Sequence, residues 1–193
     1  MKNAIKILFI LFLVNIQILA QNKLFKSLTV QEGLSDEDIN CIIQDKKGFL
    51  WIGTESGLNR YDGYEFKIFK YDQNDKNSLP NNSIWSLYED KKGNIWIGTK
   101  SGDLVRFSPI DEKFYTIEFA NSKITDNSIT SIIEDTKGDI WFGTYLNGLY
   151  RYRISNGQIK NWDYERDLPN TLSNNYVTSL LVDKYGGIWA TTY

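Results

Sequence analysis

Short runs of apolar and β-branched residues alternate with tight polar turns along most of the chain. In the first unit, the turn Asp45-Lys-Lys-Gly48 places Asp at the first turn position and Gly where a positive φ is needed. The runs around it predict strands at 39–44, 49–54, 58–61 and 64–71. Short strands joined by tight turns predict an antiparallel four-stranded meander.

The same pattern returns three more times, at intervals of about 45 residues. Each copy contains Asp-x-x-Gly-x-Ile/Leu-Trp, at Asp45, Gly48, Trp51, Asp90, Gly93, Trp96, Asp135, Gly138, Trp141, Asp183, Gly186 and Trp189. A strand-rich repeat of this length indicates the blades of a β-propeller. We therefore predict an all-β fold, a β-propeller fragment of about three and a half four-stranded blades. The units are expected at about 39–71, 84–119, 129–164 and, in part, 177–193.

The first twenty residues have the layout of a secretory signal peptide, expected as a helix over 1–20. The positive start, the apolar run and the small residue before the cleavage point are Lys2, Lys6, Ile7 to Leu19 and Ala20. The run is short for a membrane-spanning helix, which needs about 20 apolar residues. An exported chain with a propeller domain over 21–193 is therefore expected.

Residues 24–30 precede the first unit and resemble its outer strand. We predict that they form the strand that closes the propeller ring by completing its last sheet. The fourth unit stops after its second strand at Tyr193, so we expect the chain to be part of a larger propeller.

Composition narrows the functional classes. The chain has 24 acidic and 22 basic residues and a net charge of −2, which gives no electrostatic footprint for nucleic acid. It has no histidine, which excludes a phosphoacceptor histidine and any lyase that depends on one. The single cysteine, Cys41, is flanked by apolar residues and is expected to be a small buried hydrophobe. The acidic groups 36–38 and 72–75 lack the calcium-loop pattern and are read as solvated turns, so no metal or cofactor is expected.

The recurring residues are assigned to structure. The four aspartates sit in hairpin turns, and the four tryptophans are expected to fill the space between neighbouring blades. Arg60, Arg106 and Arg151 also recur and are expected to stack on aromatic rings or bond to carbonyl groups. Binding residues are instead expected on the loops, where Trp85, Tyr145 and Trp162 depart from the repeat and are candidates for a carbohydrate-facing surface.

The four in-register strings, followed by Gly57-Leu-x-Arg-Tyr61 and Gly148-Leu-x-Arg-Tyr152, resemble the two-component regulator propeller repeat. The resemblance covers about residues 24–193. It implies the periplasmic, non-catalytic sensor region of a hybrid two-component histidine kinase of the Bacteroidetes type, anchored in the inner membrane as a whole protein. It also implies an oligosaccharide ligand, and partners in the remaining propeller and kinase portions, which this chain lacks. Sensors of this type often form homodimers.

One different class stays open. An exported carbohydrate-active enzyme, or a carbohydrate-binding propeller without a kinase, could use the same scaffold. Glycoside hydrolysis needs two carboxylates facing one bond, and no non-repeating pair of this kind stands out in the sequence.

Overall fold

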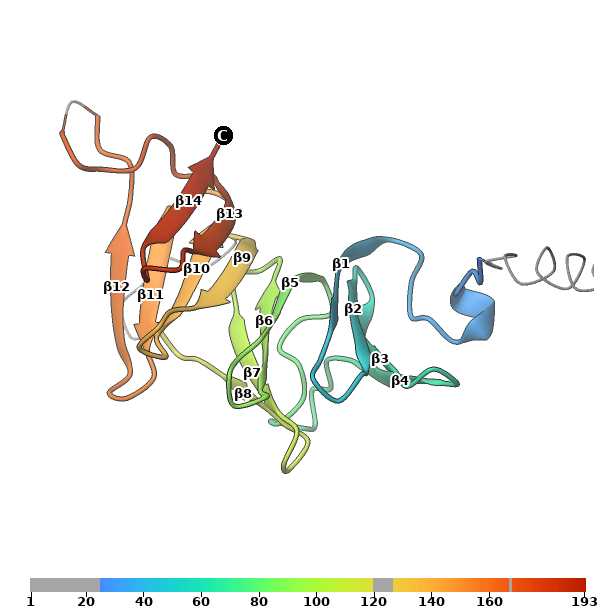
Figure 1. Ribbon diagram of the computed structural model, residues 1–193. Coiled ribbons are helices and arrows are strands. Elements are labelled where there is room, and N and C mark those ends of the chain that lie inside the picture. The colour runs from blue at the N-terminus through green and yellow to red at the C-terminus, as the bar shows by residue number, and fades with distance from the viewer. Residues whose placement is uncertain (1–24, 120–126, 167) are drawn as a thin grey trace, which may run out of the picture.

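The computed structural model describes residues 25–119, 127–166 and 168–193 as three four-stranded antiparallel sheets and one two-stranded sheet (Figure 1). Blade 1 contains β1 (Ile39–Gln44), β2 (Leu50–Thr54), β3 (Gly57–Tyr61) and β4 (Phe66–Phe69). Blade 2 contains β5 (Ile84–Glu89), β6 (Ile95–Thr99), β7 (Leu104–Ser108) and β8 (Lys113–Thr116). Blade 3 contains β9 (Ile129–Glu134), β10 (Ile140–Thr144), β11 (Leu149–Arg153) and β12 (Gln158–Trp162), and blade 4 contains β13 (Val177–Val182) and β14 (Ile188–Thr192).

Within each sheet the strands follow one another in sequence order, as in a meander. The first strands β1, β5, β9 and β13 contact one another in succession, so the sheets stand side by side around a common line (Figure 1). The predicted all-β propeller architecture is confirmed. The predicted signal peptide over 1–20 lies outside the described residues. In the described ranges, no helix has the length and apolar character needed to cross a membrane.

The blades are joined by hydrophobic seams. Trp51 of β2 is 1% exposed and lies with Leu87, Ile97 and Phe107 of blade 2 in one core. The Trp51 and Phe107 ring centroids are 5.0 Å apart. Trp96 lies in the same way against blade 3. Trp189, on the far face of blade 4, is 64% exposed, because no described sheet follows it. Trp51 and Trp96, which face four-stranded blades, are thus buried, and Trp141, which faces the two-stranded blade 4, is half-buried.

Each repeated aspartate organises both its own turn and the tryptophan of its blade. One oxygen of Asp90 accepts the backbone N–H groups of Lys92 and Asn94 at 2.9 and 2.8 Å. The other oxygen accepts the Trp96 indole Nε1–H at 3.0 Å. The same pairing joins Asp45 to Trp51, Asp135 to Trp141 and Asp183 to Trp189 at 2.8, 2.9 and 2.7 Å. The carboxylate therefore fixes the turn and orients the indole that fills the seam.

The turns also hold neighbouring blades together. Lys46 donates from its ammonium group to the Asp90 carbonyl oxygen at 2.8 Å, and Lys91 donates to the Asp135 carbonyl oxygen at 2.7 Å. These bonds link one turn to the next along the end of the blades. The recurring arginines pack as expected from the sequence: the Arg60 guanidinium lies 4.9 Å from the Phe49 ring centre, and that of Arg106 lies 4.9 Å from the Tyr115 ring centre.

The described part of the predicted closing strand over 24–30 does not pair with any described strand. Residues 25–29 have no regular structure, and Val30–Glu32 form a short 3-10 helix, η2, capped by Thr29. After it, Leu34 is buried, and the backbone N–H of Ser35 donates to Asn59 Oδ1 at 2.9 Å. A strand needs a hydrogen-bonding edge beside it. The last sheet, which this segment is predicted to complete, is not among the described sheets, so the ring-closing role stays a prediction.

Replacing Asp90 with alanine is expected to destabilise the protein by about 2–4 kcal/mol, because buried N–H donors lose their acceptor. Asp90 is 2% exposed and holds both the turn and Trp96. The measurement is chemical denaturation of the variant against the parent chain. Asp183→Ala is the matched control: no described blade follows its own, the Trp189 that it holds is 64% exposed, and its effect should be smaller. Equal losses at the two positions would contradict the proposed role of the seam.

Replacing Gly98 with alanine is expected to cost about 1–3 kcal/mol through overpacking. A Cβ built at Gly98 would lie 2.7 Å from Ile129 Cβ of the next blade, and closer still to Ser86 Oγ. The blades approach so closely here that they leave no room for a methyl group. Thr116→Ala, on the exposed surface of β8, should change stability by less than about 0.5 kcal/mol. A neutral Gly98→Ala would show that the seam can open without cost.

The thiol of Cys41 is expected to resist labelling in the folded protein. Burial raises the pKa of Cys41 to about 12, so the group stays protonated at neutral pH. Thiolate is the reactive form, so a disulfide reagent should react slowly with the native chain and rapidly after denaturation. The pKa of Cys41 is higher in the folded chain than in the unfolded chain. The protonated thiol therefore contributes to stability at neutral pH, and this contribution is lost as the pH rises toward the folded pKa of about 12. Rapid labelling of the native chain would contradict the burial of Cys41.

Candidate functional site

One end of the blades carries the loops that vary between repeats. We call it the loop face. It comprises the loops that follow β2, β6 and β10, the residue after β14, and the described residues that lead directly into β1, β5, β9 and β13. The Asp-x-x-Gly turns lie at the opposite end of the blades, because antiparallel strands reverse direction at each turn.

The backbone of the loop face is the same in all four blades. In each blade, a backbone N–H just after the second strand donates to a carbonyl oxygen just before the first strand. The pairs are Glu55 to Asp38 at 3.2 Å, Lys100 to Ser83 at 3.0 Å, Tyr145 to Ser128 at 3.0 Å and Tyr193 to Tyr176 at 3.1 Å. The scaffold position is thus constant while its side chain changes from Glu to Lys to Tyr. Constant backbone with varied side chains is the arrangement expected of a recognition surface on a rigid scaffold.

A second variable position is set by a β-bulge. The register shifts near the start of the first strand in each blade, which leaves one residue without a paired partner. These residues are Asn40, Trp85, Thr130 and Thr178. Bulges redirect a side chain and are common beside functional sites.

Glu55 gathers polar groups from two blades at the first part of this face. Its carboxylate accepts hydrogen bonds from Asn40 Nδ2 at 3.1 Å, Ser83 Oγ at 2.7 Å and Trp85 Nε1 at 3.3 Å. Lys100 Nζ lies 3.5 Å from the same carboxylate and 5.7 Å from the Trp85 ring centre. The bond from Ser83 is the largest cause that lowers the pKa of Glu55, which keeps it ionised.

Tyrosines occupy the other part of the face. The ring of Tyr145 meets that of Tyr176 edge-on, with centroids 4.7 Å apart. Tyr176 stacks on Tyr193 with centroids 5.8 Å apart. Tyr145 is 45% exposed, so this row presents aromatic surface to solvent.

The three residues predicted from the sequence to bind a ligand do not lie together in the structure. Trp85 and Tyr145 lie on the loop face. Trp162 stacks on Trp141, with ring centroids 5.0 Å apart. Trp162 pairs with Leu149 in blade 3, just as Phe69 pairs with Leu58 in blade 1. Trp162 therefore occupies a repeated position, although the sequence suggested that it departs from the repeat. Phe69 likewise stacks on Trp51, which places Trp162 in the blade packing.

Sequence reasoning missed Glu55, Lys100 and Tyr176. Their positions could have identified them. Each lies next to a strand end that is the same in every repeat, but its residue type differs from that at the equivalent position of the other repeats.

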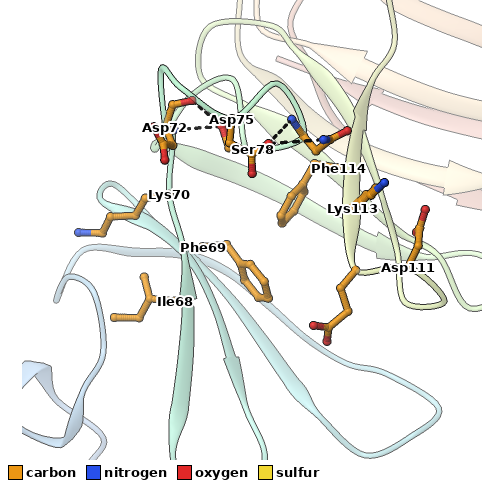
Figure 2. A pocket seen from close by; sticks show the side chains of 11 residues that line it. Ile68, Phe69, Lys70, Asp72, Asp75, Ser78, Asp111, Lys113 and Phe114 are labelled. Atoms are coloured by element: carbon orange, nitrogen blue, oxygen red, sulfur yellow. Dashed lines mark hydrogen bonds between the residues drawn. The ribbon is translucent and has the colours of Figure 1, made fainter.

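A hollow of about 460 Å³ lies on the outer side of the first seam, between β4 and β8 (Figure 2). Figure 2 shows Phe69 and Phe114 in its middle, with Asp72, Asp75 and Ser78 grouped at one end. Its polar groups already serve the fold: Asp72 and Asp75 accept the N–H groups of Asn74 and Asn77. On the same side, Glu112 pairs with Arg60 and Lys67 at 2.9 and 2.6 Å. The hollow is therefore part of the seam between blades 1 and 2.

The acidic groups do not assemble into a metal centre in the described ranges, where no cluster of three or more potential ligands occurs. Asp36 has the same local role as Asp72, since one of its oxygens accepts the Asp38 N–H at 3.0 Å. These contacts agree with solvated turns.

Comparison with solved structures shows similarity to extracellular domains of two-component systems. The extracellular domain of a protein described as the hybrid two-component system BT4673 of B. thetaiotaomicron matches with a TM-score of 0.76 and 28% identity. The match covers 89% of this chain and 23% of that chain. The corresponding domain of BT3049 from the same organism matches with a TM-score of 0.74 and 25% identity, over 86% of this chain and 24% of that chain.

Sequence comparisons agree. "Histidine kinase P4" of Formosa agariphila is 41% identical over 73 residues, which is 38% of this chain and 5% of that protein. The chain thus spans a small part of the length of its relatives. The model of the family "Two component regulator propeller" matches residues 33–56, 78–101, 123–146 and 171–193, one match for each blade. With four matches in register with four sheets, the chain belongs to the two-component regulator propeller family.

Proposed function

We propose that this chain is the non-catalytic sensing region of a hybrid two-component sensor, that it acts in the periplasm, and that it binds an oligosaccharide on the loop face. The observation that carries the proposal is the constant backbone at Glu55, Lys100, Tyr145 and Tyr193, which presents four side chains on one rigid surface. Family membership and the extracellular domains among the solved relatives support the location and the role in sensing.

The chemistry of the loop face suits sugar binding. Exposed tyrosine rings offer flat apolar surface to the C–H faces of a sugar, and Lys100 and the neighbouring polar groups offer hydrogen bonds to hydroxyl groups. In this proposal the kinase that responds to the ligand belongs to other parts of the full protein.

The competing class, a carbohydrate-active enzyme, fits the geometry less well. A glycosidase needs a carboxylic acid whose pKa is raised, so that it can donate a proton. The pKa of Glu55 is lowered instead, first by the bond from Ser83. Its oxygens are also occupied by Asn40 and Trp85. This carboxylate stabilises the surface and is poorly suited to proton transfer.

The test is thermal unfolding of the chain with a panel of xylo-, manno-, gluco- and arabino-oligosaccharides and oligogalacturonides. A ligand at about 100 times its Kd stabilises the folded state by about 2.7 kcal/mol, which raises Tm by several degrees. The bound sugar should be recovered uncut by chromatography.

Tyr145→Ala on the loop face should weaken the shift, and Tyr64→Ala in the exposed β3–β4 turn at the opposite end should not. A panel in which no sugar changes Tm would refute oligosaccharide binding, and cleaved products would favour the enzyme.

A further inference from the structure

The polar and aromatic parts of the loop face form one continuous surface. Ser128 connects them: its hydroxyl donates to the Lys100 carbonyl oxygen at 3.2 Å, and its carbonyl oxygen accepts the Tyr145 N–H at 3.0 Å. Contacts therefore run without a break from Glu55 in blade 1, through Lys100 and Tyr145, to Tyr193 in blade 4. A linear ligand could follow this path across the ends of successive blades.

At the end of the loop face that carries Glu55 and Lys100, the two charged groups differ in how much of their hydrogen-bonding capacity is already used. Three neutral donors, from Asn40, Ser83 and Trp85, already occupy the two oxygens of Glu55. Lys100 makes a longer contact to Glu55 at 3.5 Å, and its side chain is 55% exposed. An ammonium group has three donors, so Lys100 keeps hydrogen-bonding capacity for a ligand while Glu55 has little left.

Trp85 does not serve as a free stacking surface. Its indole N–H is directed at Glu55, and Lys100 lies over the ring. These two contacts hold the ring in place beneath the ammonium group. Stacking surface is found instead at the other end, on Tyr145. The two ends thus offer different chemistry: hydrogen-bond donors at one and flat aromatic rings at the other.

We propose that the loop face holds two subsites, a polar subsite at Lys100 and a tyrosine subsite at Tyr145, Tyr176 and Tyr193, which bind different sugars of one neutral oligosaccharide. The inference rests on the proposed function and specifies it. Lys100 donates to a hydroxyl oxygen of one sugar, and the tyrosines stack on another. Glu55 is a positioning residue that orients Trp85 and Lys100.

The preference for a neutral ligand follows from the charges at the polar subsite. Glu55 and Lys100 carry opposite charges and lie 3.5 Å apart, so their fields largely cancel for a ligand beside them. A uronate would meet the ammonium group and the carboxylate together and would gain little over a hydroxyl. Removing the charge of Glu55 should therefore change the selectivity of the site.

The experiment is calorimetric titration of the chain with neutral xylo-, manno-, gluco- and arabino-oligosaccharides, their monosaccharides, and oligogalacturonides. Lys100→Ala and Tyr145→Ala should each weaken binding of the neutral oligosaccharide about tenfold, and the double variant about a hundredfold, since independent contacts add in free energy. The monosaccharide should bind at least about a hundredfold more weakly than the oligosaccharide, because it occupies one subsite. Tyr64→Ala is the control for substitution of an exposed aromatic residue.

Glu55→Gln distinguishes positioning from simple structural support. It leaves Lys100 without its counter-charge, so affinity for the neutral oligosaccharide should fall while affinity for oligogalacturonide rises. A merely structural role would lower both. Thermal unfolding of each variant shows whether it is folded.

Three results would overturn the two-subsite inference while leaving the proposed function in place. These are a monosaccharide that binds as tightly as the oligosaccharide, an oligogalacturonide that binds the parent chain more tightly than the neutral sugar, and a folded Lys100→Ala variant with unchanged affinity. If no sugar in the panel binds the parent chain, the proposed function fails, and the inference fails with it.

Discussion

The carboxylate–indole pair in each blade is the interaction on which the architecture depends. One aspartate oxygen satisfies the N–H groups of its turn, and the other fixes the indole six residues later, as in Asp90 and Trp96. The paired groups are buried in blade 2, where an unmade bond would cost about 1–3 kcal/mol for each polar group left unsatisfied. A single side chain therefore links turn geometry to the packing of neighbouring sheets, which explains why Asp and Trp recur together.

Close approach of the blades is the second part of the same constraint. With the indole held in the seam, the first strand of the next blade comes so near that Gly53, Gly98 and Gly143 each have no space for a Cβ. The seams of blades 1 to 3 therefore have a fixed geometry, and so do the strand ends that border them. This rigidity allows the loop face to keep one backbone arrangement while its side chains vary from blade to blade.

The fold could be predicted from the sequence because the pattern repeats. Features that differ from one repeat to the next could not. The strands, the turn aspartates and the half-buried Cys41 follow from hydrophobic pattern and turn chemistry. The strand expected at 24–30 depends on a partner sheet that is not among the described sheets, so a local pattern alone does not settle it. Trp162 looked unique because it replaces Phe69 by a larger ring at the same register, and only the strand pairing reveals the equivalence. Glu55 was not predicted from the sequence because its hydrogen-bond partners come from the next blade.

The division between scaffold and surface explains how such a repeat can serve recognition. The buried residues of the seams and the residues of the Asp-x-x-Gly turns hold each blade to its neighbour, and they cannot vary without loss of packing. The side chains of Lys100 and Tyr145 project beyond the last backbone bond of their strands, where a change of side chain alters the surface but not the seam. Trp85 reaches the same surface through its bulge, which separates it from the strand pairing. The fold therefore permits changes of ligand chemistry at these positions at little cost in stability, and it places them next to one another along a single path.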